Sequence, residues 1–230
     1  MIRYSPAQRW AVLGKSGSGK TFATVLVAAA LVPFSSRDWQ VWWLDSKHDP
    51  DDLALLHRWG YRPAMEREAR ATPRRIFDLR GSRAAVHEQA QLISARALEV
   101  GGVLLVYDEY GQLVKSKVDA GVEIENVHKR GRGLDVGSIG GVQEPAYCPR
   151  YLFSQANHLL IGSLTHLRDV KIARELNPRY APGWPEERPD TVPDPHGFWL
   201  KHLDGFGDDG SWWYWAAMDR WYAHVTGRVA

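Results

Sequence analysis

Most of the chain alternates between short apolar runs and longer polar segments. The apolar runs lie at 10–13, 39–45, 74–80, 103–109, 136–143 and 158–164. Each run is short, contains β-branched or aromatic residues and ends at polar residues or glycine, which is typical of strands. The run at 103–109 is apolar without alternation until its last two residues, which indicates a strand buried on both faces of a sheet.

Helical patterns separate these runs. Residues 21–31 are rich in Ala, Val and Leu up to Pro33, and residues 82–100 have a polar start, an Ala/Leu/Gln/Glu body and two glycines behind them. A third helix is expected at 118–130. Strands that alternate with helices predict an α/β fold, with a mainly parallel sheet that is flanked by helices on both faces.

The composition changes near residue 178. Six of the 13 prolines lie between Pro178 and Pro195, and six of the 11 tryptophans lie at position 184 or later. The prolines favour an extended connector, and the aromatic runs on either side of FGDD predict a β-hairpin at 198–218. We therefore expect residues 1–177 to form the core, and 178–230 to add a proline-rich connector and a C-terminal aromatic hairpin to the same domain.

Composition narrows the class of protein only a little. The net charge of +2 does not by itself imply a polyanionic partner. Cys148 is the only cysteine, which excludes an internal disulfide and fits a reducing compartment. The apolar stretch at 23–34 is too short to span a bilayer, so we expect no stable membrane insertion.

Residues 14–21 read GKSGSGKT and fit the phosphate-loop pattern G-x-x-x-x-G-K-[ST], between a predicted strand and a predicted helix. Glycines let successive backbone N–H groups point at phosphate oxygens, and the helix start adds its positive dipole end. Lys20 is expected to be exposed and to reach the β and γ phosphates, and the Thr21 hydroxyl to bind Mg²⁺. The candidate nucleotide-binding residues are Gly14, Lys15, Ser16, Gly17, Ser18, Gly19, Lys20 and Thr21.

Two carboxylates and an amide complete this candidate site. Asp108 and Glu109 end the apolar run VLLVY, so Asp108 is expected to bind Mg²⁺ and Glu109 to activate the attacking water. Gln143 ends the next predicted strand and is expected to contact the γ phosphate or the water. The alternative is that these residues are solvated strand ends. A glutamate positioned for water indicates a hydrolase rather than a nucleotide-gated switch.

Two absent motifs narrow the nucleotide. No Asn-Lys-x-Asp guanine-binding motif follows residue 109, and the Leu-Ser-Gly-Gly-Gln signature of transporter ATPases does not occur. The nucleotide is therefore expected to be ATP.

Four stretches together resemble the FtsK/HerA superfamily of DNA-translocating P-loop ATPases, and the small viral genome-packaging ATPases are the members most similar in length. The stretches are GKSGSGKT, WWLDSKHDP, VYDEYGQL and KRGRGLDVGSIGGVQEP, within roughly residues 8–175. This sequence departs from the family pattern at Glu144, which stands between Gln143 and Pro145.

The resemblance implies a RecA-like (ASCE) fold and an ATP-hydrolysing translocase of double-stranded DNA. It further implies a homo-oligomeric ring of five or six subunits that packages a viral or mobile-element genome, with a capsid or portal-vertex protein as partner. Such a protein would work in the host cytoplasm or in association with the virion.

Basic residues outside the phosphate loop have two interpretations each. Arg130 or Arg132, in HKRGRG, could be the arginine that a ring ATPase supplies to a neighbouring subunit, or could complement a helix end. Lys115 and Lys117 follow the carboxylates and are candidate DNA-phosphate contacts, although solvated surface lysines are the better single interpretation.

Two other functions stay open. A protein-moving assembly ATPase, as in filamentous-phage morphogenesis, would need a membrane segment that the sequence does not indicate. A small-molecule phosphotransferase would need an acceptor site, whereas Glu109 favours water as the acceptor.

Overall fold

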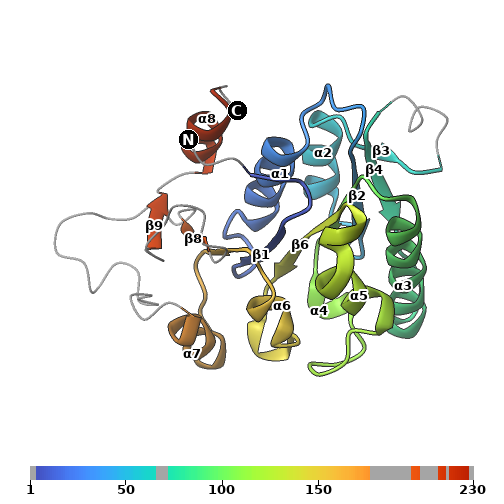
Figure 1. Cartoon of the computed structure of the whole chain (residues 1–230). Coiled ribbons are helices and arrows are strands. Elements are labelled where there is room, and N and C mark those ends of the chain that lie inside the picture. The colour runs from blue at the N-terminus through green and yellow to red at the C-terminus, as the bar shows by residue number, and fades with distance from the viewer. Residues whose placement is uncertain (1–3, 66–71, 177–197, 203–211, 216–217, 228–230) are drawn as a thin grey trace.

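One large sheet organises the molecule (Figure 1). The computed structural model describes residues 4–65, 72–176, 198–202, 212–215 and 218–227. Within these ranges the strand order is β3-β4-β2-β5-β6-β1-β7-β8-β9. Neighbours from β3 to β7 pair in parallel, whereas β8 is antiparallel to both β7 and β9. The predicted α/β class with a mainly parallel sheet is confirmed.

The elements have the following bounds. The strands are β1 (Arg9–Leu13), β2 (Gln40–Asp45), β3 (Arg62–Pro63), β4 (Arg74–Asp78), β5 (Val103–Tyr107), β6 (Val136–Val142), β7 (His158–Ile161), β8 (Phe198–His202) and β9 (Trp212–Trp215). The α-helices are α1 (Lys20–Leu31), α2 (Pro50–Arg58), α3 (Arg83–Val100), α4 (Tyr110–Leu113), α5 (Val122–Arg130), α6 (Tyr151–Ser154), α7 (Leu167–Leu176) and α8 (Met218–Thr226). Two short 3₁₀ helices are η2 (Gly131–Leu134) and η3 (Pro145–Tyr147).

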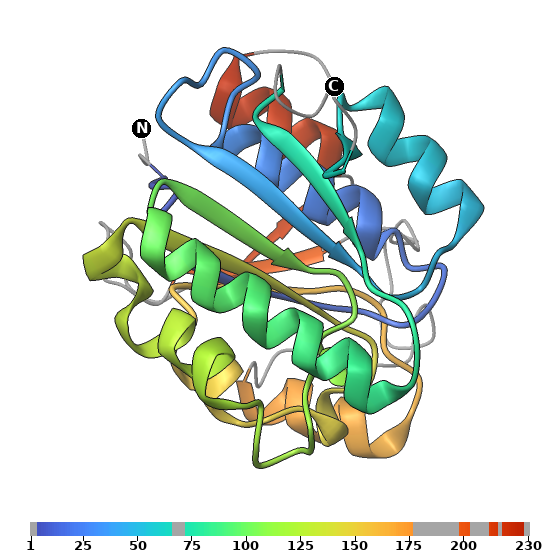
Figure 2. The same cartoon turned by 90° about the vertical axis from the view of Figure 1, so that its right-hand side faces the viewer.

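Helices cover both faces of the sheet and create two apolar cores (Figure 2). One core joins α1, α2 and α8 to the sheet through side chains such as Leu26, Leu56 and Trp221. The other joins α3, α5, α6 and α7 to the opposite face. Because both faces are covered, every residue of β5 and β6 is buried, as the continuous apolar run in β5 predicted.

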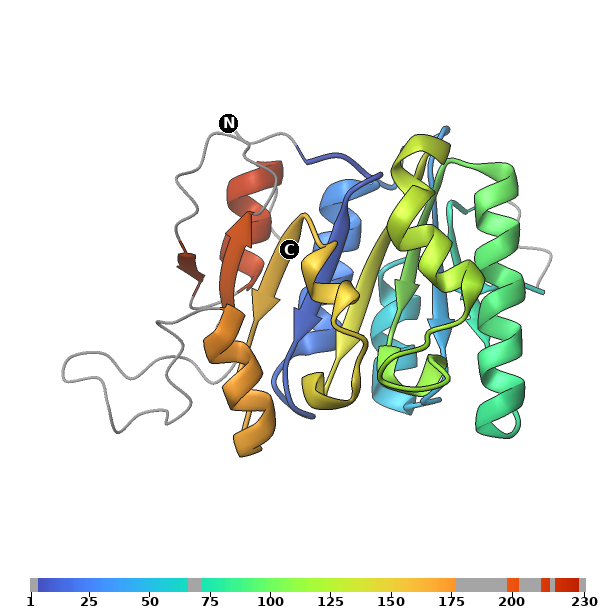
Figure 3. The same cartoon turned by 60° about the horizontal axis from the view of Figure 1, so that its bottom comes forward.

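The carboxyl ends of the parallel strands meet at one edge of the sheet (Figure 3). The loop after β1 leads into α1, and the segments after β2, β5 and β6 lie beside it because those strands are close neighbours of β1 in the sheet. Polar residues at the ends of several parallel strands are thereby brought together. In open α/β sheets this edge is the usual place for ligands.

Several elements begin or end differently from the predictions. β5 ends at Tyr107, before the two carboxylates, and α5 starts at Val122 because Gly121 has a positive φ of 85° that interrupts the predicted helix. The sequence analysis missed α2, although Asp49 caps it and Pro50 opens it, which is a common helix-start pattern. It also missed α7 and α8.

The C-terminal aromatic segment joins the main sheet. β8 and β9 are antiparallel, as expected for the predicted hairpin, and β8 also pairs with β7. The residues between β8 and β9, and the proline-rich connector at 178–195, lie outside the described residues. The domain division at 177 stays a prediction.

Two smaller findings concern the cysteine and membranes. Cys148 is buried, and burial raises the pKa of its thiol. In the described part of the chain, no helix combines the length and the apolar character that crossing a membrane requires.

Candidate functional site: a phosphate loop beside buried carboxylates

The loop at 14–21 has the backbone shape that a phosphate-binding loop needs. Gly17 and Gly19 have positive φ angles of 73° and 79°, a conformation that glycine adopts without steric cost. The loop is fixed to the sheet on two sides, because the Gly14 N–H donates to the Val142 carbonyl (3.0 Å) and the Lys15 N–H to the Ser163 carbonyl (2.8 Å). The start of α1 follows at once, so its free N–H groups lie at the loop.

Lys20 is buried, which corrects the expectation that it would be exposed. Its Nζ lies 3.8 Å from Oε2 of Glu109. Burial lowers the pKa of Lys20, and the nearby ammonium of Lys47 lowers it further, against the effect of Glu109 and Asp108. The lysine is therefore directed into the site, among charged groups.

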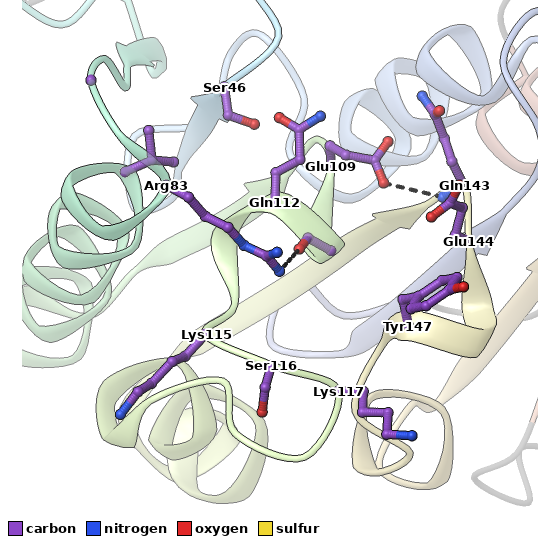
Figure 4. Close-up of a pocket in the computed structure, with 13 residues that line it drawn as sticks. Ser46, Arg83, Glu109, Gln112, Lys115, Ser116, Lys117, Gln143, Glu144 and Tyr147 are labelled. Carbon is purple, nitrogen blue, oxygen red and sulfur yellow. Dashed lines mark hydrogen bonds between the residues drawn. The ribbon is translucent and has the colours of Figure 1, made fainter.

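Asp108 and Glu109 sit between β5 and α4 at the same edge, and both are buried. Oε1 of Glu109 accepts a hydrogen bond from the Gln143 N–H at 3.2 Å (Figure 4). Burial raises the pKa of Glu109, while Lys20 and Lys47 oppose that rise. A carboxylate with a raised pKa is a better proton acceptor than an ordinary surface glutamate, which suits a general base.

Gln143 is thus brought to the site, but its observed contact uses the backbone. The Gln143 N–H orients Glu109, and Gln143 also lines the cavity beside the phosphate loop. The role expected for the side-chain amide, contact with the γ phosphate or the water, stays a prediction.

The sequence analysis missed Lys47, which lies just after β2. Its Nζ lies 3.2 Å from Oδ2 of Asp108 and 3.7 Å from Oε2 of Glu109. Burial alone would lower the pKa of Lys47, but the two carboxylates outweigh this and raise it, so the group is charged at neutral pH. The signal was present, because WWLDSKHDP places a lysine directly after a central strand.

Asp52, on α2, is a second residue that the sequence analysis missed. Its Oδ2 accepts a hydrogen bond from the Thr21 hydroxyl at 3.2 Å. Burial raises the pKa of Asp52, and the charge of Asp108 adds to the rise. Its carboxylate therefore belongs to the same electrostatic cluster as Asp108.

The residues present fit a nucleotide-bound Mg²⁺. Mg²⁺ is usually held by one or two protein oxygen ligands together with substrate phosphates and waters. Thr21 and Asp108 supply a hydroxyl and a carboxylate beside the loop, and Asp52 supplies a second carboxylate next to Thr21. Among the described residues, no group of three or more His, Cys, Asp or Glu side chains forms a metal site of its own. The arrangement suits an ion that arrives with a nucleotide.

Two cavities meet at this cluster. A cavity of about 460 Å³ is lined by the phosphate loop, Lys47, Asp52, Arg58 and Gln143. A larger one of about 730 Å³ is lined by Glu109 and Gln143 among others (Figure 4). Gln143 therefore lines both cavities, and the glutamate that the sequence predicts to be catalytic lines the larger one.

Lys115 and Lys117, the candidate DNA contacts, line the larger cavity. Lys115 also forms an exposed ion pair with Asp119, with Nζ and Oδ2 3.6 Å apart. Arg83, at the start of α3, lines the same cavity and donates to the carbonyl of Gly111 at 3.1 Å, which ties α3 to the segment after Glu109. Three basic residues thus line the same cavity as Glu109.

Arg130 and Arg132 are not brought to this site. They lie at the end of α5 and in η2, directly before β6 begins, and therefore at the opposite edge of the sheet from the phosphate loop. Both are exposed. Within one subunit they cannot reach the bound nucleotide, so any catalytic role requires a neighbouring subunit.

Comparisons with known proteins agree with this architecture. No protein-family model and no curated protein matches the chain. Among solved structures, the DNA-packaging ATPase B204 from Sulfolobus turreted icosahedral virus matches with a TM-score of 0.62 at 13% identity, over 91% of this chain and 97% of that one. The genome-packaging NTPase B204 from Sulfolobus turreted icosahedral virus 2, in complex with AMPPCP, gives 0.57 at 15% identity, over 91% and 97%.

A protein of another kind has a similar fold. A KaiC-like protein from Pyrococcus horikoshii matches with a TM-score of 0.50 at 12% identity, over 90% of this chain and 85% of that one. At such identities the likeness concerns the fold and not the activity. The chain has the α/β fold of P-loop ATPases, as the sequence predicted.

Proposed function

We propose that this protein is an ATPase that translocates double-stranded DNA, and that it packages a viral or mobile-element genome. The observation that carries the proposal is the position of Glu109. Its buried carboxylate lies between the phosphate-loop lysine and a second cavity that is lined by Lys115 and Lys117. A change at the nucleotide can therefore be transmitted to basic residues only a few positions further along the chain.

The chain's own residues have distinct roles in the proposed hydrolysis. The loop N–H groups and Lys20 bind the phosphates, and Glu109 accepts the proton of the attacking water. The Gln143 N–H holds Glu109 in place. Thr21 and Asp108 hold Mg²⁺, which supplies neutralisation of the phosphate charge when it is bound.

The remaining parts of the proposal concern assembly. The exposed Arg130 or Arg132 reaches the site of the next subunit in a ring of five or six copies, and Lys115 and Lys117 contact DNA phosphates. The similarity in fold to two viral packaging NTPases supports this assignment. A capsid or portal-vertex protein is the expected partner, and the host cytoplasm or the virion the expected location.

The test is whether DNA stimulates ATP hydrolysis. Phosphate release is measured with no nucleic acid, with single-stranded DNA and with double-stranded DNA, and Glu109→Gln serves as the inactive control. We expect the largest stimulation with double-stranded DNA, and displacement of a third strand from a triplex as the protein moves. Hydrolysis that no DNA affects would contradict the translocase and favour the protein-moving ATPase. Phosphate transfer to a small molecule would favour the phosphotransferase.

A further inference from the structure

The segment after β2 is shaped so that Lys47 enters the nucleotide site. Oδ1 of the buried Asp45 accepts hydrogen bonds from the N–H groups of both Lys47 and His48, each at 3.0 Å. His48 has a positive φ of 57°, a conformation that non-glycine residues adopt infrequently, and its Nε2 lies 2.6 Å from Oδ1 of Asp78. Uncommon backbone conformations that persist because their surroundings fix them cluster at functional sites. The turn is fixed at both ends, and Lys47 lies within it.

The ammonium of Lys47 lies among the groups that face the nucleotide. Its side chain is 14% exposed, and it lines the same cavity as the phosphate loop. Lys20 and Lys47 both approach Oε2 of Glu109, at 3.8 Å and 3.7 Å. That oxygen is buried and accepts no hydrogen bond within the described part of the chain.

A simple structural salt bridge does not explain this arrangement well. The Nζ atoms of Lys20 and Lys47 converge on Oε2 of Glu109, and Nζ of Lys47 also lies 3.2 Å from Oδ2 of Asp108. Asp108 and Glu109 balance the two ammonium charges, but this pairing does not account for the fixed turn at Lys47 or for the position of Lys47 in the cavity beside the phosphate loop. The terminal phosphate of a nucleoside triphosphate would add negative charge at this end of the loop, whereas a diphosphate would not.

We propose that Lys47 is a second phosphate-binding lysine, which contacts the terminal phosphate of a triphosphate beside Lys20 and is held by Asp108 and Glu109 when that phosphate is absent. The proposal rests on the nucleotide-binding part of the proposed function and not on its DNA part. It makes Lys47 the residue that distinguishes the triphosphate from the diphosphate, and it couples that distinction to the carboxylate that activates water.

The test compares the binding of two nucleotides by calorimetry. AMPPCP, which is not hydrolysed, and ADP are titrated with Mg²⁺ into the wild type, Lys47→Ala, Lys47→Met and Lys171→Ala. Lys47→Met keeps most of the apolar stem without the charge. Lys171→Ala removes an exposed lysine of α7 and is the matched control. Thermal melting of each nucleotide-free variant reports its folding.

Both Lys47 variants should bind AMPPCP about 10- to 100-fold more weakly, the range for one charge-assisted hydrogen bond. Their affinity for ADP should change less than about threefold, and the control should match the wild type. An equal loss for both nucleotides, unchanged binding or tighter AMPPCP binding would each overturn the proposal. Wild-type protein that binds neither nucleotide would overturn the nucleotide site as well. If Lys47 proves to select AMPPCP over ADP as expected, but DNA does not stimulate ATP hydrolysis, only the translocase proposal would be overturned.

Discussion

The substitution Gly141→Ala should lower the rate of ATP hydrolysis by moving a carboxylate that it does not touch. Gly141 lies in β6, next to the point where the chain leaves β5. A Cβ atom added there would lie 3.2 Å from the carbonyl carbon of Asp108 and closer still to its oxygen. The contact with the oxygen is the shorter of the two and therefore sets the displacement, so the backbone must separate by about 1 Å to reach ordinary van der Waals distances. The added Cβ and the Asp108 carbonyl are both fixed to the main chain, so no change of side-chain rotamer can relieve the contact.

The size of the effect follows from this displacement. A misplacement of about 1 Å in an active site can cost about 100-fold in rate, so we expect a loss of roughly that size. The Lys15 N–H still anchors the phosphate loop to the Ser163 carbonyl, which follows β7 on the side of β1 away from Gly141, so the ADP affinity should change by less than about threefold. Overpacking should also lower the free energy of unfolding by about 1–3 kcal/mol.

Phosphate release, ADP binding and thermal melting are measured on the variant and two controls. Gly133→Ala is neutral by design, because no atom lies within 4 Å of the added Cβ. Gly140→Ala, on the same strand, meets the side chain of Leu152, which can move, so we expect a smaller loss of rate. Wild-type rates in Gly141→Ala, or an equal loss in Gly140→Ala, would refute the reasoning.

The remaining predictions concern the glutamate, the phosphate-loop lysine and the ring. Glu109→Gln should bind ATP normally and hydrolyse it about 100-fold more slowly or worse, as expected for a lost general base; a variant that binds no nucleotide would instead make Glu109 a structural residue or a metal ligand. Wild-type turnover should decline as the pH falls, because protonated Glu109 cannot accept a proton. Since the pKa of Glu109 is raised, the decline should occur above pH 4.5, the ordinary pKa of a glutamate, and Glu109→Gln should not show it. Lys20→Ala should abolish hydrolysis. Mixing this variant with Arg130→Ala or Arg132→Ala should restore part of the activity. Hydrolysis is measured with double-stranded DNA present, and sedimentation shows whether mixed assemblies form. Co-assembled mixtures that stay inactive, or full activity of both arginine variants alone, would exclude an arginine supplied between subunits.

The features that the sequence alone could predict are those that depend on local spacing. The glycines and the lysine of 14–21 predict a phosphate loop because that backbone shape depends on neighbours within a few positions. The same holds for Asp108 and Glu109, which end a continuous apolar run. Alternation of strands and helices was enough to predict the parallel sheet, since parallel neighbours need a crossover.

The tertiary structure decided which distant side chains meet. Lys47 and Asp52 follow β2, and they reach the site beside the phosphate loop only because β5 and β6 place β2 close to β1 in the sheet. The burial of Lys20 and the orientation of Glu109 by a backbone N–H also depend on elements that are far apart in the sequence. β8, which follows the proline-rich connector in the sequence, also joins the sheet by pairing with β7. Local patterns define each strand and loop, but strand order sets which charges face one another, and that order arises from the packing of the whole sheet.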